Sequence, residues 1–271
     1  MTRLYKQDPL SPEEREELED DLIAFCDCEL DLLGDIKGLD VLYAGGSSPL
    51  WIEGLSQRIG DGGSVTAIDV DVKRVDETQT SLSQAELAAP VRLLAADVFG
   101  MPFEPDTFDL VYSSGLFHEL DVKERGAEDA LAALRSVARA GGRVATGDFV
   151  DSEEALQLED EELEAELRRE AYARESYGIG PPERLVALHE RHLADVWWLV
   201  SPPQGIRHLG KLVLAEDEPT ELSSLPQPTA RRLRENRDTL RARILAEDYT
   251  HPATLYAEGL VRGPESRRSS K

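Results

Sequence analysis

The sequence has little of what secreted, membrane-spanning or zinc-binding proteins usually carry. Its two cysteines, Cys26 and Cys28, lie two positions apart in a helical pattern, so they point to different faces and suit neither a disulfide nor a zinc site. No apolar run approaches the length that crosses a membrane, and residues 1–6 lack the apolar core of a signal peptide. We therefore expect a cytoplasmic protein that neither inserts into a membrane nor holds a metal ion.

Positive charge is also scarce. Lys and Arg number 30 against 54 Asp and Glu, which gives a formal net charge of -24. Such a field repels nucleic acid and anionic membranes, so neither is expected as a partner. The stretch 226–271 is the exception, with ten basic and six acidic residues, and docking of this end on the acidic remainder is one interpretation. Nothing in the composition indicates an oligomeric state.

The stretch 39–71 organises the rest of the chain. Residues 39–44 are a short apolar run that indicates a strand buried on both faces. Gly45 and Gly46 follow, where the chain turns sharply and brings bare backbone close to another group. After a helical pattern, residues 64–68 indicate a second buried strand that ends on Asp69. This order of strand, glycine turn, helix, strand and acid is typical of a nucleotide-binding βαβ unit.

The start of the intervening helix carries two hydroxyls and a proline. Ser47 and Ser48 are expected to cap the helix, and Pro49 suits its first position. The free N–H groups there can receive a carboxylate or a phosphate, and a carboxylate such as Asp69 can accept from both hydroxyls of a ribose. An adenosine ligand is the first hypothesis. The alternative is that the glycines only form a tight turn and that Asp69 only caps a strand end.

Further strands continue this pattern. Apolar runs at 91–96, 108–113 and 143–150 alternate with amphipathic helical segments, which predicts a parallel sheet covered on both faces. Two more apolar runs, 193–200 and 206–215, are joined by only five residues. Five residues cannot form a parallel crossover, so this pair is expected to be an antiparallel hairpin.

Four segments of the sequence together resemble motifs of the class I S-adenosylmethionine-dependent methyltransferases. They are the glycine loop VLYAGGSS, the acidic strand end AIDVD, the third strand with its aspartate LLAADVFGMPF, and the segment after the fourth strand FDLVYSSGLFHEL. Two of these segments, LLAADVFGMPF and FDLVYSSGLFHEL, look most like the small-molecule branch of the family, which includes the ubiquinone and menaquinone biosynthesis methyltransferases. The resemblance implies an α/β fold with a Rossmann-like, mostly parallel sheet, an antiparallel hairpin at its end and helices on both faces.

The resemblance also implies a cofactor, S-adenosylmethionine, and a set of cofactor-binding residues. Gly45 and Gly46 would let the methionine part lie against the backbone, and Asp69 would accept from the ribose hydroxyls. Asp97 would accept from the adenine amino group. The whole set is Ala44, Gly45, Gly46, Asp69, Val70, Asp97, Val98 and Ser113.

The chain departs from the family pattern at two places. Tyr43 stands where the family's first strand usually ends in an acid, and the loop usually written G-x-G-x-G here continues as Ser47-Ser48-Pro49. These departures are the best support for an alternative, a degenerate methyltransferase fold that serves as a ligand-binding or scaffold protein. A nicotinamide-dependent oxidoreductase is a further alternative, weakened by the absence of G-x-G-x-x-G.

The predicted activity is direct in-line transfer of a methyl group to a small-molecule acceptor. Such transfer depends mainly on positioning and on exclusion of water, and a base matters only if the acceptor must lose a proton. His118 follows the fourth strand and has an ordinary pKa suited to that work, so it is the candidate catalytic residue. The other interpretation of His118 is a histidine without a catalytic role at the start of a helix.

The predicted organisation has three parts. Residues 1–38 form an N-terminal helical cap, residues 39–215 form the methyltransferase domain, and residues 216–271 form a linker, a basic helix and a disordered tail. Within the domain, residues 151–181 are an acidic helical insertion. Together with the helix at 11–34, it is a candidate lid over the acceptor pocket.

Overall fold

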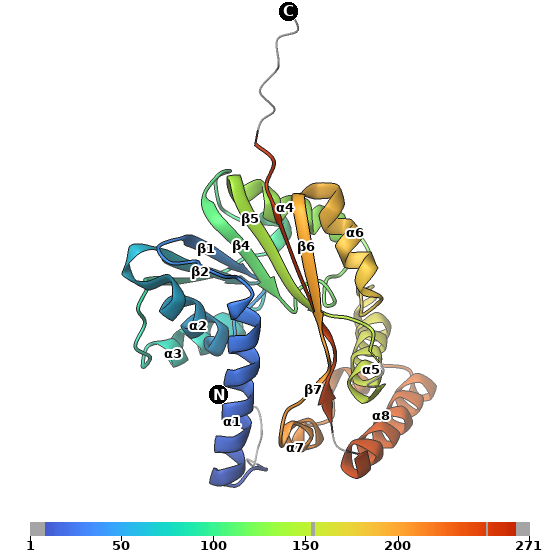
Figure 1. Ribbon diagram of the computed structural model, residues 1–271. Coiled ribbons are helices and arrows are strands. Elements are labelled where there is room, and N and C mark those ends of the chain that lie inside the picture. The colour runs from blue at the N-terminus through green and yellow to red at the C-terminus, as the bar shows by residue number, and fades with distance from the viewer. Residues whose placement is uncertain (1–8, 153–154, 248, 264–271) are drawn as a thin grey trace, which may run out of the picture.

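The computed structural model describes residues 9–152, 155–247 and 249–263 (Figure 1). Its centre is a seven-stranded sheet with the strand order β3-β2-β1-β4-β5-β9-β6, and helices cover both faces. The predicted fold class, a mostly parallel Rossmann-like sheet, is confirmed. None of the helices in the described ranges combines the length and the apolar character that a membrane crossing needs.

The elements follow one another in a β-α alternation through the first half of the chain. The strands are β1 (Asp40–Ala44), β2 (Ser64–Asp69), β3 (Val91–Ala95), β4 (Phe108–Ser114), β5 (Ala138–Phe149), β6 (Ala194–Ser201), β7 (Gln204–Gly205), β8 (Thr250–His251) and β9 (Thr254–Leu260). The α-helices are α1 (Pro12–Asp31), α2 (Pro49–Ile59), α3 (Val72–Leu82), α4 (Ala127–Val137), α5 (Ala155–Tyr172), α6 (Pro182–His192), α7 (Leu209–Ala215) and α8 (Gln227–Glu247). Short 3-10 turns are η1 (Gly60–Gly62), η2 (Val98–Gly100) and η3 (Thr220–Ser223).

The first five strands run parallel, and the direction in which new strands are added reverses at β1. β1 pairs with β2 on one side and with β4 on the other, so the chain moves outward through β3 and then returns to the opposite side. At such a reversal two connecting segments leave in opposite directions from the carboxyl edge of the sheet. This opens the crevice in which open α/β sheets bind ligands.

Two hydrophobic cores lie on opposite faces of the sheet. One contains α4 and α6 with the inward side chains Leu42, Ala44 and Val111. The other contains α1, α2 and α3, and it takes alternate residues of the same strands, among them Tyr43 and Tyr112. This two-sided burial explains why the first strands are nearly continuous apolar runs.

The expected hairpin is wrong in its second strand. Residues 209–215 form helix α7, and β6 pairs instead with β9, which runs antiparallel to both β5 and β6. The apolar residues Leu209, Leu212 and Val213 recur at helical spacing, and periodicity over so short a run does not separate strand from helix. The partner strand therefore lies at residues 254–260, inside the range expected to be linker, basic helix and tail.

The acidic helix α5 lies alongside the basic helix α8 (Figure 1). Arg232 pairs with Glu166 at 2.6 Å, and Arg243 pairs with Glu159 at 2.5 Å. The basic C-terminal region thus docks on the acidic part of the chain, as its charge suggested. The last residues, 264–271, which were expected to be disordered, lie outside the described residues.

Candidate functional site

A sharp turn joins β1 to α2 and depends on both of its glycines. Gly45 has a φ of +73°, a conformation that side chains disfavour, and the N–H groups of Gly45 and Gly46 donate to the Ile68 carbonyl at 2.9 and 3.2 Å. A Cβ added at Gly45 would collide with Leu116, and one at Gly46 would collide with the Tyr43 ring. The turn is thereby tied to the end of β2.

Asp69, at the end of β2, is held by the same loop. Its side chain is 7% exposed; Oδ2 accepts from the Ser47 hydroxyl at 2.7 Å, and Oδ1 accepts from the Asp71 N–H at 2.8 Å. The expectation that Ser47 and Ser48 both cap α2 is wrong. Ser48 is the N-cap residue but makes no side-chain cap, because its backbone alone starts the helix, and the Ser47 hydroxyl is engaged by Asp69. Ser47 therefore belongs to the site, and sequence reasoning missed this role.

A cavity of about 720 Å³ opens beside this loop. Its wall includes the turn, the acid of β2 and the segment after β4, with one side closed by α1. The residues from these elements that line it include Gly45, Gly46, Ser47, Asp69, Ser114 and Gly115. The structure thus brings Gly45, Gly46 and Asp69 together around one space, as predicted.

The other predicted cofactor residues do not line this cavity within the described part of the chain. Ala44 is buried behind the turn, and the buried Ser113 hydroxyl lies 3.3 Å from Thr146 Oγ1. Val70 follows Asp69 and is 74% exposed, an apolar side chain left uncovered. Asp97 is exposed and accepts from the Phe99 N–H at 3.0 Å as the cap of η2, while Val98 is buried.

Tyr43 replaces the expected acid with an aromatic ring. The ring is 2% exposed and stacks on Tyr112, with the ring centroids 5.5 Å apart. Burial raises the pKa of both hydroxyls well above their usual value, so both stay neutral. The end of β1 therefore brings an apolar surface to the cavity and no charge of its own.

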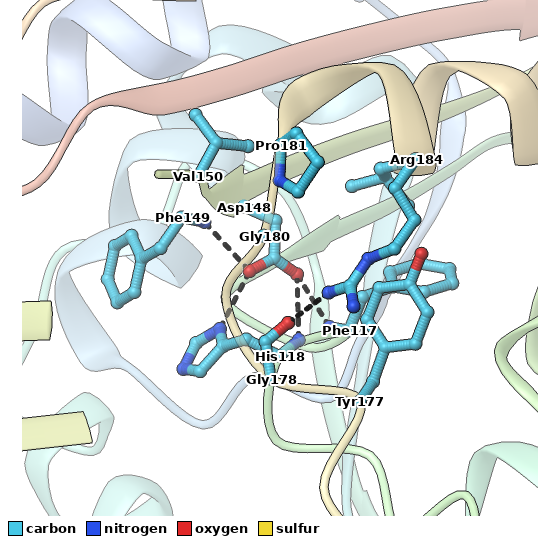
Figure 2. Close-up of a pocket in the computed structure, with 11 residues that line it drawn as sticks. Phe117, His118, Asp148, Phe149, Val150, Tyr177, Gly178, Gly180, Pro181 and Arg184 are labelled. Carbon is cyan, nitrogen blue, oxygen red and sulfur yellow. Dashed lines mark hydrogen bonds and ion pairs between the residues drawn. The ribbon is translucent and has the colours of Figure 1, made fainter. Parts of the chain in front are cut away.

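His118 lies on the other side of the β4–α4 segment, in a small pocket (Figure 2). Its Nδ1 lies 2.7 Å from Oδ1 of Asp148, at the end of β5, and its ring stacks on Phe149. Asp148 also accepts from the backbone N–H groups of Phe117 at 2.6 Å and Phe149 at 2.8 Å (Figure 2). Asp148 therefore fixes both the segment after β4 and the ring of His118.

The charge state of His118 follows from this pairing. Burial lowers the pKa of the ring, but the charge of Asp148 and the hydrogen bond to it raise the pKa by more. The charges of Glu161 and Glu119 raise it further, in smaller measure. The pKa rises to about 9. The ring is therefore protonated near neutral pH, and it does not line the large cavity.

Glu29 is a second buried carboxyl that sequence reasoning missed. It lies on α1 and is 6% exposed, and the Tyr112 hydroxyl donates to its Oε1. Its position continues the spacing of the apolar residues Leu18, Leu22 and Phe25 along α1. An acid on the apolar face of a helix was the signal that could have identified it.

No group of three or more His, Cys, Asp or Glu side chains within residues 9–152, 155–247 and 249–263 is arranged to hold a metal ion. His189, on α6, is buried, with Nε2 lying 3.1 Å from Thr146 Oγ1.

Comparison with known proteins identifies the central part of the chain. Residues 41–142 match the family model for a methyltransferase domain. No curated protein sequence matches the chain significantly.

Solved structures share the fold at low sequence identity. The YcgJ protein from Bacillus subtilis aligns over 92% of this chain and 100% of its own, with 14% identity and a TM-score of 0.51. A phosphoethanolamine N-methyltransferase 2 from Haemonchus contortus aligns over 90% of this chain and 53% of its own, with 14% identity and a TM-score of 0.55. A geranyl diphosphate methyltransferase aligns over 94% of this chain and 93% of its own, with 16% identity and a TM-score of 0.55. Residues 41–142 are therefore similar to a methyltransferase domain, and the chain has the Rossmann-like fold of these solved methyltransferases.

Proposed function

We propose that this protein is an S-adenosylmethionine-dependent methyltransferase that acts on a small-molecule acceptor by in-line transfer. The observation that carries the proposal is the cavity of about 720 Å³, which has the bare glycine turn and the Asp69 carboxylate in one wall. Its size lies within the roughly 300–1,000 Å³ of small-molecule sites. Bound there, the cofactor supplies an activated methyl group on a sulfonium, so the protein needs only to bind, orient and exclude water.

The chain's residues fit such a cofactor through their chemistry. Gly45 and Gly46 leave the backbone bare, and Asp69, oriented by the Ser47 hydroxyl, can accept from the two ribose hydroxyls. The uncovered side chain of Val70 supplies an apolar surface for the adenine. Asp97 and Val98, at the end of the neighbouring strand, are proposed to recognise the adenine edge, and Ala44 and Ser113 support the site from behind.

The acceptor is proposed to lie on the side of the cavity closed by α1 and α2. Leu22 and Ile23 of α1 and Trp51 of α2 contribute apolar surface there, which favours an organic acceptor. Two structural neighbours are named for small acceptors or were solved with them, geranyl diphosphate and phosphomonomethylethanolamine. They support a small acceptor without identifying it.

The general-base role of His118 is not carried into this proposal. A ring whose pKa is about 9 is already protonated near neutral pH and has no lone pair for a further proton. We assign His118 a positioning role, because its pair with Asp148 fixes the segment that contributes Ser114 and Gly115 to the cavity.

Calorimetry with S-adenosylmethionine, S-adenosylhomocysteine and a nicotinamide dinucleotide tests the proposal. We expect both adenosyl ligands to bind at a single site and the dinucleotide to give no heat. Failure of both adenosyl ligands would leave the scaffold alternative. Binding of the dinucleotide alone would favour the oxidoreductase.

A further inference from the structure

The carboxyl group of Glu29 is buried in the fold, where a glycine of β5 leaves room for it. It reaches from α1 to β5 and lies against Gly147. A Cβ at Gly147 would collide with Oε1, so only glycine admits the carboxyl at this position. Glu29 is thus accommodated by the carboxyl edge of the sheet, where ligands of this fold class bind.

Three side chains with donor groups lie around the Glu29 carboxyl. The Tyr112 hydroxyl donates to Oε1, and Ser114 and Trp51 are close enough to lower the pKa of the carboxyl. The single N–H of Trp51 donates to the Tyr112 hydroxyl at 3.2 Å. A carboxylate is an acceptor only, so an arrangement of donors from β4 and α2 suits its ionised form.

Two of these donors also line the large cavity. Ser114 and Trp51 form part of its wall, as does Tyr43, which stacks on Tyr112. The Glu29 carboxyl therefore lies one side chain behind the cavity surface. In a buried setting a charge at this separation is screened far less than in water.

The titratable groups around Glu29 make its ionisation costly, and among the described residues of the cavity wall the positive charge is that of Arg74. Burial raises the pKa of the Glu29 carboxyl, the three donors lower it, and the carboxylate of Asp148 on β5 raises it again. Tyr43 on β1, Tyr112 on β4, Tyr256 on β9 and Cys26 on α1 also face this region, and each of these acids has a raised pKa. A further positive charge in the cavity would stabilise the ionised carboxylate and so lower the pKa of Glu29.

We propose that Glu29 is a positioning residue that ionises when a positively charged ligand enters the cavity and so favours the sulfonium cofactor over its neutral thioether product. The proton goes to solvent on cofactor binding and returns when the product is formed. Glu29 would thereby supply from α1 the negative charge that the end of β1 lacks at Tyr43. This inference rests on the proposed function.

The test compares S-adenosylmethionine, which carries the sulfonium, with S-adenosylhomocysteine, which does not. Calorimetry in buffers of different ionisation enthalpy measures affinity and proton release together, at several pH values at which the protein stays folded. For the wild type we expect proton release with the sulfonium ligand only, and an affinity for it that rises with pH. In Glu29→Gln the preference for the sulfonium ligand should fall by about tenfold, and the proton release should vanish.

Asp31→Asn is the matched control. Asp31 lies on the same helix, is exposed and pairs with Arg58 at a distance of 2.7 Å. Neither residue is among the described residues of the cavity wall, so this change removes one negative charge without touching the site. Its ligand preference should equal that of the wild type. Reduced preference in both variants would mean that overall charge decides, and it would overturn the inference.

The remaining outcomes separate the inference from the proposed function. Unchanged preference and proton release in a folded Glu29→Gln protein would overturn the inference alone. If that variant does not fold, the wild type decides, because equal proton release with both ligands would also overturn it. Failure of the wild type to bind either ligand would overturn the proposed function and this inference with it.

Discussion

Helices α1 and α5 are both additions to the nucleotide-binding unit, yet they attach in different ways. α1 buries Leu18, Phe25, Cys26, Glu29 and Leu30 and packs against α2 and the sheet. α5 buries Leu167 and packs on α8 through Leu156 and Leu163 as well as through pairs between acidic and basic side chains. One helix is held by the core, and the other is held by a second helix.

The two helices also differ in which cavity they lie beside. α1 lines the large cavity through Glu19, Leu22 and Ile23, so its position sets the shape of that wall. α5 approaches the small pocket instead, where Glu161 acts on the protonated His118. α1 is therefore part of the wall of the large cavity, whereas α5 is attached chiefly to α8.

The largest expected effect is on stability. Leu30 is fully buried on α1, so Leu30→Ala should lower the free energy of unfolding by about 3–5 kcal/mol. Leu167→Ala, the matched change on α5, should cost about 2 kcal/mol, because its surroundings can relax more easily. Urea unfolding measures both, and equal costs would mean that α5 belongs to the same core as α1.

The second effect is a loss of stability at high pH. Because the folded pKa of His118 is raised from 6.5 to about 9, the stabilisation is complete below pH 6.5 and is lost as the pH rises through about 9. The difference corresponds to about 3 kcal/mol. Unfolding curves at several pH values should show this decline, and His118→Gln should remove it. A decline that persists in the variant would show that another group causes it.

The third effect concerns cofactor affinity at the frame of the site. Asp69→Ala should weaken S-adenosylmethionine binding by about 1.5–3 kcal/mol, the scale of hydrogen bonds to a charged group. Glu166→Ala on α5 removes a carboxylate outside the cavity and should leave the affinity unchanged. Calorimetry compares the two, and wild-type affinity in Asp69→Ala would remove Asp69 from the ribose site.

The fourth effect is protection from hydrogen exchange, which tests the prediction that both helices form a lid. Amides of α1 near the cavity should exchange about tenfold more slowly with cofactor and product bound, because opening must then break ligand contacts. Protection in α5 as well would extend the lid to that helix. Unchanged exchange in both helices would exclude a lid.

The smallest effect is expected between α5 and α8. Arg243 and Glu159 are each more than one-third exposed, so Arg243→Gln should leave the free energy of unfolding nearly unchanged, and any change should shrink at high salt. Unfolding at low and high ionic strength checks this. A larger cost that salt does not reduce would show that the pair acts through packing.

The sequence alone determined the parts that depend on local pattern. Buried parallel strands are nearly continuous apolar runs, and the turn at Gly45 needs a positive φ, so strands, turn and fold class could be predicted from neighbouring residues. The capping box of Ser11 and Glu14 at the start of α1 is likewise formed by neighbouring residues. The acid at the end of β2 was predicted by its position, since the carboxyl ends of parallel strands meet at one edge.

Only the tertiary structure decided which distant groups meet. β9 lies between β5 and β6 in the sheet, although it follows β6 in the chain by more than 50 residues. Helix α7 is stabilised by neighbours that cover one of its faces. The pairs of His118 with Asp148 and of Glu29 with Tyr112 join segments 30 and 83 residues apart. Their charge states follow from burial and from those partners, and no local pattern encodes either.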